Sequence, residues 1–264
     1  MADSIDKVVS FFHSWHWSTE KYPALGAFIR GMVEHPERLS QEGKNIWDSN
    51  NKTVELCQVP DDAGTFRIAL KRSSEQRFWR YFLRPSLALR EYYGFREATR
   101  LGMPCVEVLA CGEKRNGFRL KESYFVTRFA EDAYQMQEYE FDYPRREAHA
   151  EMLALLSELM VQIARLHAAG FRHGGAHGRN FLCRKQPEGK IEILWIDLAT
   201  LRRFSRRKRW KEILLDLSDL LEYFDLSEDE LARLQRLYCE ITGFPVRFEK
   251  CDGPRRKRNR CVIA

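Results

Sequence analysis

Hydrophobic and polar residues alternate with a period of two in the first half of the chain, as they do in β-strands. From Phe66 to Lys71, large apolar side chains occupy every second position, and Arg67 and Lys71 lie between or after them. The polar stretch from Asp61 to Gly64 predicts a turn that joins this strand to a preceding one over 47–59. The segments 106–113 and 123–131 predict two further strands. A helix over 84–102, closed by a Gly and a following Pro, completes a small lobe made of a sheet and one helix.

A helical period dominates the second half. Between residues 144 and 169 the large apolar residues form one stripe, and Gly170 is typical of a residue that ends a helix. A loop, a strand pair around residues 187–189 and two more helices over about 210–224 and 227–242 are expected next. We therefore predict an α+β protein with four parts: an N-terminal helical extension (1–45), a small β-rich lobe (46–135), a helical lobe (136–250) and a mobile basic tail (251–264).

Composition excludes several classes of protein. The 264 residues are 44% hydrophobic and 31% charged, which is incompatible with intrinsic disorder or a collagen-like chain. Seven cysteines without a Cys-x-x-Cys pair predict reduced thiols rather than a disulfide framework or a zinc ribbon. The sequence has neither a run of 18 apolar residues nor the charge pattern of a signal peptide. We expect a soluble, cytoplasmic globular protein.

Positive charge is concentrated in two segments. Residues 202–211 include seven basic side chains and residues 255–260 five more, whereas the net charge of the whole chain is only +6, so the remainder is acidic. Such segments bind phosphates, anionic lipids or nucleic acid, or are simply solvated. Only Phe204 and Trp210 are interleaved with the charges, which does not favour nucleic acid. The last four residues, Cys-Val-Ile-Ala, also fit a prenylation box, a short pattern with meaning only in a eukaryotic cell.

Four chemically related features follow one another along the chain in a fixed order. Phosphoryl transfer from ATP requires a lysine for the phosphates, a glutamate that orients the lysine, and an asparagine and an aspartate that hold Mg²⁺. Each residue alone is weak evidence, because a lone strand lysine is usually a surface charge, and only their order and the two-lobe setting favour a kinase. The candidates are Lys71 at a strand end, Glu91 on the next helix with Glu97 as the alternative, Asn180 in the loop that begins at His173, and Asp197 after an apolar strand.

The motifs GFRHGGAHGRNFLC, ILWIDLATLRRF and FLRPSLALREYYGFREATRLGMPCVEVLACGE resemble the bacterial lipopolysaccharide core kinases, the Kdo kinase/WaaP family. The resemblance covers about residues 45–225. It implies a two-lobed protein-kinase-like fold, the cofactors ATP and Mg²⁺, and phosphorylation of a core sugar at the inner face of the cytoplasmic membrane. The basic segments would then contact lipopolysaccharide core or another anionic glycolipid.

The chain departs from the family pattern at the catalytic base. The family loop reads His-x-Asp, but here the sequence is His173-Gly174-Gly175, so the position of the catalytic aspartate is occupied by Gly175. His177 is a candidate substitute base, and the pair of histidines is also a weak candidate for a metal site, although packing of His173 in the loop is the simpler interpretation. Residues 48–53 contain no glycine where protein kinases have a glycine-rich loop. Two functions remain open: a phosphotransferase weakened by Gly175, or an inactive pseudokinase that binds a partner or glycolipid.

Overall fold

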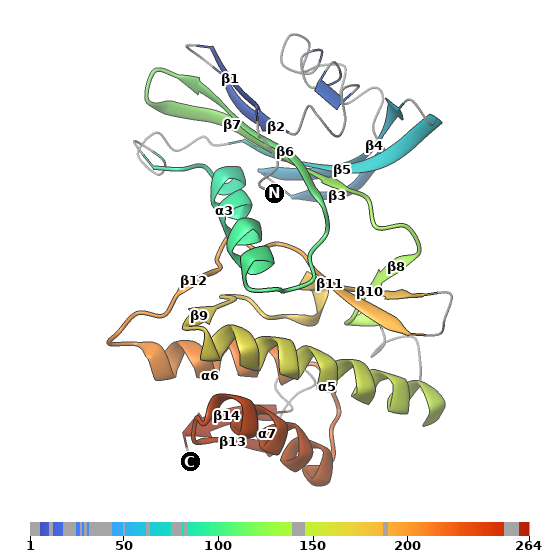
Figure 1. Ribbon diagram of the computed structural model, residues 1–264, viewed down its shortest axis with the longest axis vertical. Coiled ribbons are helices and arrows are strands. Elements are labelled where there is room, and N and C mark those ends of the chain that lie inside the picture. Colours follow the sequence, from blue (N-terminus) through green and yellow to red (C-terminus); the bar gives the residue numbers. More distant parts are fainter. Residues whose placement is uncertain are drawn as a thin grey trace. The chain divides into compact units, whose positions relative to one another are not determined.

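The structure of the chain is a computed structural model (Figure 1). The chain forms two compact units, one of Met1–Phe95 with Val106–Glu131 and one of Arg96–Cys105 with Asp132–Ala264. Strands prevail in the first unit and helices in the second, so the predicted α+β class is confirmed. The residues that the structure describes are 6–10, 13–17, 25–26, 28, 31, 44–49, 51–61, 64–74, 81, 84–138, 146–186, 190–250 and 259–263.

An antiparallel sheet of seven strands, in the order β1-β2-β6-β7-β5-β4-β3, forms the first unit. The β4–β5 hairpin is the longest pairing in the sheet and begins at the predicted turn, with Asp61 opposite Gly64. The strands are β1 (Asp6–Ser10), β2 (His13–Trp17), β3 (Lys44–Ser49), β4 (Lys52–Asp61), β5 (Gly64–Ser74), β6 (Val108–Asn116) and β7 (Arg119–Arg128).

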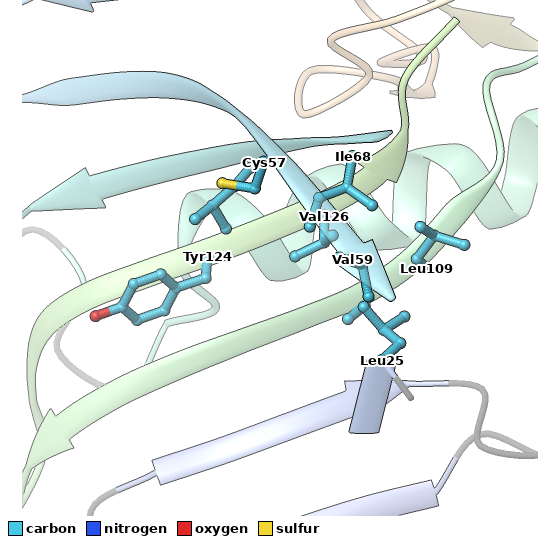
Figure 2. Packing of buried hydrophobic residues seen from close by; sticks show 9 residues of the cluster. Leu25, Cys57, Val59, Ile68, Leu109, Tyr124 and Val126 are labelled. Carbon is cyan, nitrogen blue, oxygen red and sulfur yellow. The ribbon is translucent and has the colours of Figure 1, made fainter. Parts of the chain in front are cut away.

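The alternation of side chains along β5 gives the sheet two different faces. Ile68 and Leu70 are fully buried in an apolar cluster on one face (Figure 2). Lys71 follows Leu70 and therefore points to the opposite face, where its register partner on β7 is Phe125. Helix α3 (Leu87–Arg100) packs on that second face, since the rings of Phe95 and Phe125 lie 5.3 Å apart. The period of the strand thus directs Lys71 toward α3.

Two predictions for this unit were wrong. The first part of the predicted helical extension forms strands β1 and β2, in a segment whose Val, His and Trp residues favour strands over helices. The single strand predicted over 47–59 is two strands, because the chain reverses after Ser49, which pairs with Lys52 at the start of β4. The carbonyl oxygen of Asn51 accepts a hydrogen bond from the amide of Ser74, so this tight turn is anchored to β5.

The second unit is built around the long helix α5. Its predicted apolar stripe, which includes Leu156, Leu159 and Ile163, is buried, and Gly170 follows the helix with a φ of 85°. Helix α7 is capped at both ends. Ser227 and Glu230 form a capping box at its start, and Gly243 ends the helix. Besides α5 (Arg146–Ala168) and α7 (Glu228–Thr242), the unit contains α6 (Arg209–Leu221), the 3₁₀ turn η3 (Gly178–Asn180), β8 (Ala133–Gln135), β9 (Phe171–Arg172), β10 (Phe181–Lys185), β11 (Ile191–Trp195) and β12 (Arg202–Arg203).

Part of the predicted mobile tail has regular structure. Residues Asn259–Ile263 form β14, which pairs with β13 (Val246–Lys250) in an antiparallel hairpin. Cys261, the cysteine of the prenylation box, is buried opposite Phe248. The sequence did not reveal this strand because the basic run before it hides the short apolar pattern; residues 251–258 of the predicted tail lie outside the described residues. No helix among the described residues is long and apolar enough to cross a bilayer.

Candidate phosphotransfer site

Lys71 and Glu91 form an ion pair in the first unit. The Nζ atom of Lys71 lies 2.7 Å from Oε1 of Glu91. Glu91 belongs to the apolar stripe of α3 that also carries Ala88, Phe95 and Ala98, and it is only 1% exposed. A buried carboxylate requires a counterion, and the face of β5 that carries Lys71 supplies one.

Glu97, the alternative partner for the lysine, has a different role. It lies one and a half turns further along α3, is partly exposed, and binds Arg100 with 3.0 Å between the charged atoms. A pair three residues apart on a helix surface is a common local interaction of little energetic weight. The structure therefore selects Glu91 over Glu97.

In the second unit, Asn180 and Asp197 lie at the same end of the β10–β11 hairpin. Asn180 immediately precedes β10, and one residue separates Asp197 from the end of β11. The main-chain amide of Ile196 donates to the carbonyl oxygen of Asn180 at 3.0 Å, so the two segments are hydrogen-bonded directly beside the two side chains. Asp197 has a φ of 56°, a left-handed conformation that non-glycine residues rarely adopt. Strain of this kind is typical of residues held in place at a functional site.

The loop that contains Gly175 is hydrogen-bonded to the side chain of Asn180. The Nδ2 atom of Asn180 donates a hydrogen bond of 2.8 Å to the carbonyl oxygen of Gly175. A Cβ atom added at Gly175 would meet only that Nδ2 atom, at 3.8 Å, whereas one added at Gly174 would lie 2.9 Å from Cβ of Thr200. The two glycines are thus not equivalent. Position 174 has no room for a side chain, and position 175 has.

His173 is buried among aromatic side chains. Its ring lies 5.3 Å from both Phe181 and Trp195, and neither ring nitrogen has a hydrogen-bond partner among the described residues. Burial lowers the pKa of His173 to about 4, against the smaller opposing effects of the carboxylates of Asp216 and Asp197. The ring is therefore neutral at physiological pH. It packs the loop and does not share a metal site with His177, which contacts other residues.

Asp216 on α6 holds the backbone of this loop, and the sequence analysis missed it. Its carboxylate accepts hydrogen bonds from the main-chain amides of His173 at 2.7 Å and of Gly174 at 2.8 Å. Burial alone would raise the pKa of Asp216, but the hydrogen bond and charge of His167, with Arg172 contributing, hold it below its usual range. Asp216 is fully buried on the apolar stripe of α6. An acidic residue on such a stripe was the signal that could have revealed it.

A buried relay continues from Asp216 to helix α7. Nε2 of His167 lies 3.3 Å from the carboxylate of Asp216, and Nδ1 lies 2.7 Å from the hydroxyl of Tyr238. Because an ionised carboxylate can only accept, Nε2 of His167 donates to Asp216, and Nδ1 is hydrogen-bonded to the hydroxyl of Tyr238. Helices α5, α6 and α7 are therefore joined by hydrogen bonds to the loop that carries Gly175.

The first basic segment is exposed over most of its length. Arg206, Arg207 and Lys208 point to solvent at the start of α6. Two other members make structural contacts: Arg202 forms an ion pair with Glu212, and the guanidinium of Arg209 lies 4.3 Å from the centre of the Phe244 ring. Fewer basic side chains of this segment are thus available to bind an anion than the sequence suggested. Arg255–Arg258 of the second basic segment lie outside the described residues.

Comparison with known proteins agrees with the class that this geometry defines, a protein of kinase-like fold. A solved structure described as WaaP in complex with acyl carrier protein matches with a TM-score of 0.57 and 19% identity, over 78% of this chain and 81% of that one. The PknI kinase domain of Mycobacterium tuberculosis matches with a TM-score of 0.41 and 20% identity, over 59% of this chain and 56% of that one. No curated protein sequence matches the chain.

The family follows from the sequence itself. The model of the lipopolysaccharide kinase (Kdo/WaaP) family matches residues 68–238, well over half of the chain. The chain belongs to this family, and the resemblance and the kinase-like fold expected from the sequence are confirmed.

Proposed function

We propose that this protein is an ATP- and Mg²⁺-dependent phosphotransferase that acts on a core sugar of lipopolysaccharide, with a turnover lowered by Gly175. The observation that carries the proposal is the ion pair of Lys71 with the buried Glu91. A strand lysine held by a helix glutamate is the arrangement with which protein kinases bind the phosphates of ATP. Membership of the lipopolysaccharide kinase family supports the class of reaction.

The side chains in the second unit suit Mg²⁺. Asn180 and Asp197 provide hard oxygen atoms, and Mg²⁺ characteristically takes few protein oxygens together with water and phosphate oxygens. Since Nδ2 of Asn180 is bonded to Gly175, its Oδ1 atom is the one that would face the ion. A bound Mg²⁺ would neutralise charge on the phosphates. Lys71 would bind phosphate oxygens, and the loop anchored by Asp216 would position Asn180.

With Gly175 at the position of the aspartate, no side chain there can accept the proton of the acceptor hydroxyl. General bases contribute about 10²- to 10⁴-fold to rates. Phosphoryl transfer depends mainly on positioning and on electrostatic stabilisation, so the loss of the base slows the reaction without abolishing it. From a kinase turnover of about 1–100 s⁻¹, a value between about 10⁻⁴ and 1 s⁻¹ is expected.

The acceptor and the location follow from the family and from surface charge. The exposed side chains of Arg206, Arg207 and Lys208 form a surface suited to phosphorylated glycolipid. We infer peripheral attachment to the inner face of the cytoplasmic membrane, with lipopolysaccharide core as the substrate. Nucleic acid is not favoured, because few aromatic side chains accompany the charges.

A second candidate function is that of an inactive pseudokinase that binds a partner or an anionic glycolipid. The specific observation in its favour is again Gly175, at which a side chain has room but is missing. In this alternative the ion pair and the loop network preserve the fold and nucleotide binding, and phosphoryl transfer is absent.

Nucleotide binding and turnover on the same samples test the proposal. Mg²⁺-dependent binding of ATP should be lost in Asp197→Ala, which removes the charged oxygen ligand. Asp132→Ala is the matched control, because Asp132 has a similar φ of 55° but is exposed. Slow ATP-dependent phosphorylation of lipopolysaccharide core, absent in Asp197→Ala, supports the phosphotransferase. Binding without any transfer supports the pseudokinase, and binding unaffected by Asp197→Ala overturns the assigned site.

A further inference from the structure

His177, Asp219 and Glu222 bring three metal-binding side chains together in the second unit. Nδ1 of His177 lies 3.1 Å from Oε1 of Glu222, and Nε2 lies 3.8 Å from Oδ2 of Asp219. One donor atom from each residue can be chosen so that all three lie within 4.8 Å of one another. The side chains are 22%, 27% and 20% exposed, so they are accessible to an ion and partly shielded from water.

Two separate elements fix this cluster. His177 immediately precedes η3 in an extended conformation, with φ −68° and ψ 146°. Asp219 and Glu222 are three residues apart at the end of α6 and therefore share one face of the helix. The same helix binds the loop through Asp216, so its orientation toward His177 is set independently of the cluster.

The electrostatics of the cluster favour a cation. Asp219 and Glu222 lie at the C-terminal end of α6, where the helix dipole already places negative charge, and the last turn contains no basic residue. Asp216 adds a further carboxylate one turn earlier. Arg172 attracts Asp219, but its ion pairs are made with Glu212 and Asp216. The cluster thus brings two carboxylates together beside one imidazole, and a divalent ion would balance the charge of the carboxylates.

We propose that His177, Asp219 and Glu222 bind a divalent transition metal, for which Zn²⁺ is the best match. An imidazole nitrogen with two carboxylate oxygens suits Zn²⁺, whereas Mg²⁺ and Ca²⁺ take oxygen ligands. Bonds of about 2.0–2.2 Å in a tetrahedron place donor atoms roughly 3.4 Å apart, close to the 3.1 Å between Nδ1 of His177 and Oε1 of Glu222. Rotation of the partly exposed carboxylates closes the remaining distance. The fourth position would hold water.

This metal would connect the loop of Gly175 to the end of α6. His177 lies two residues after Gly175, and its carbonyl oxygen accepts the hydrogen bond of the Asn180 amide. The site is separate from the oxygen ligands proposed for Mg²⁺, and it does not depend on the proposed function.

Titration of the purified, metal-free full chain with Zn²⁺ tests the proposal. One equivalent should bind, and the bound ion should raise the unfolding temperature. His177→Gln and, as a second and milder change, Glu222→Gln should each weaken binding by at least tenfold. His149→Gln is the matched control: His149 contacts Glu230 at 2.7 Å and belongs to no three-residue metal-binding cluster in the described part of the chain, so this variant should bind as the unaltered chain does.

The cysteines require a spectroscopic control, because thiols also bind Zn²⁺. Co²⁺ should give visible absorption bands typical of nitrogen and oxygen ligands, without thiolate charge-transfer bands. Absence of one-to-one binding, unchanged binding in both variants, or thiolate bands would overturn the proposal. Binding of Mg²⁺ and ATP is measured in the same zinc-free samples. A failure of the proposed function can then be distinguished from a failure of the zinc proposal.

Discussion

The side-chain amide of Asn180 is hydrogen-bonded to the main-chain carbonyl of Gly175, with 2.8 Å between the two atoms. The bond uses the backbone of Gly175 and is therefore independent of the side chain at that position. It also orients Asn180 from within the same loop, so that this residue does not need a catalytic aspartate to keep its place.

Restoring the missing carboxylate should raise activity. We expect Gly175→Asp to increase ATP-dependent phosphorylation by about 10²- to 10⁴-fold, because an aspartate can accept the hydroxyl proton. The added Cβ meets nothing closer than 3.8 Å, and the φ of 158° is at the limit of the region that side chains avoid. Steady-state kinetics measure the gain, with thermal unfolding as the check on folding.

Gly174→Ala is the control for this substitution. Its Cβ would lie 2.9 Å from Cβ of Thr200, at a φ of 82°. We expect a loss of stability of about 1–3 kcal/mol and no gain in activity. A Gly175→Asp protein that folds normally but gains no activity would show that more than the base is missing.

Lys71→Met should reduce both nucleotide affinity and stability. The substitution leaves the carboxylate of Glu91 buried without its lysine, which costs about 1–3 kcal/mol. Adding Glu91→Gln should recover stability, because the uncompensated charge is removed, but not nucleotide binding. Urea unfolding and ATP titration of the single and double variants separate the two effects. Lys121→Met, on β7, is the control, and equal loss of affinity in that variant would contradict a specific role of Lys71.

Stability should fall as the medium becomes acidic, in part through His173. The folded protein keeps this ring neutral down to a pKa of about 4, whereas the unfolded chain binds a proton near the ordinary value of 6.5. The unfolded state thus gains protons first, and the contribution of His173 is present above pH 6.5 and is lost between about pH 6.5 and 4. The loss amounts to as much as about 3 kcal/mol.

Urea unfolding at several pH values measures this dependence. In His173→Phe, which keeps a ring between Phe181 and Trp195, the slope over that window should decrease. His149→Gln, whose side chain is 43% exposed, should retain it. An unchanged slope in His173→Phe would show that other groups cause the acid sensitivity.

Neutralising Arg206 and Arg207 should weaken binding to anionic vesicles. Each basic side chain near such a surface contributes about 1 kcal/mol, so the double variant should lose roughly 30-fold in affinity. Arg233 and Arg236 on α7 are exposed as well, and their double neutralisation is the matched control. Binding of the unaltered protein should decrease with salt, since screening acts over about 8 Å. Equal losses in both variants would indicate attraction by net charge alone.

The sequence predicted elements whose signals are local. The signals of the apolar stripe of α5 and of the alternation along β5 each span neighbouring residues, and both elements formed as expected. The Lys71–Glu91 pair could be predicted because the order of motifs is itself a sequence property. The assigned roles of Asn180 and Asp197 stay predictions.

What the sequence could not show are contacts made by tertiary packing. Asp216 lies 43 residues from the loop amide that it binds, and nothing near it in the sequence indicates this partner. Strand β2 pairs with β6, about a hundred residues away along the chain, so a local pattern does not reveal it. The cluster of His177 with Asp219 and Glu222 arises in the same way, from a loop and a helix that only the fold brings together.

The hydrogen bonds from Asp216 determine which substitutions this loop tolerates. Because α6 holds the main-chain amides of His173 and Gly174, the loop needs its glycine at 174 for both space and backbone conformation, whereas at 175 there is space and only the φ of 158° favours glycine. The side chain at 175 can therefore change the chemistry of the loop while the anchoring of its backbone by α6 stays the same.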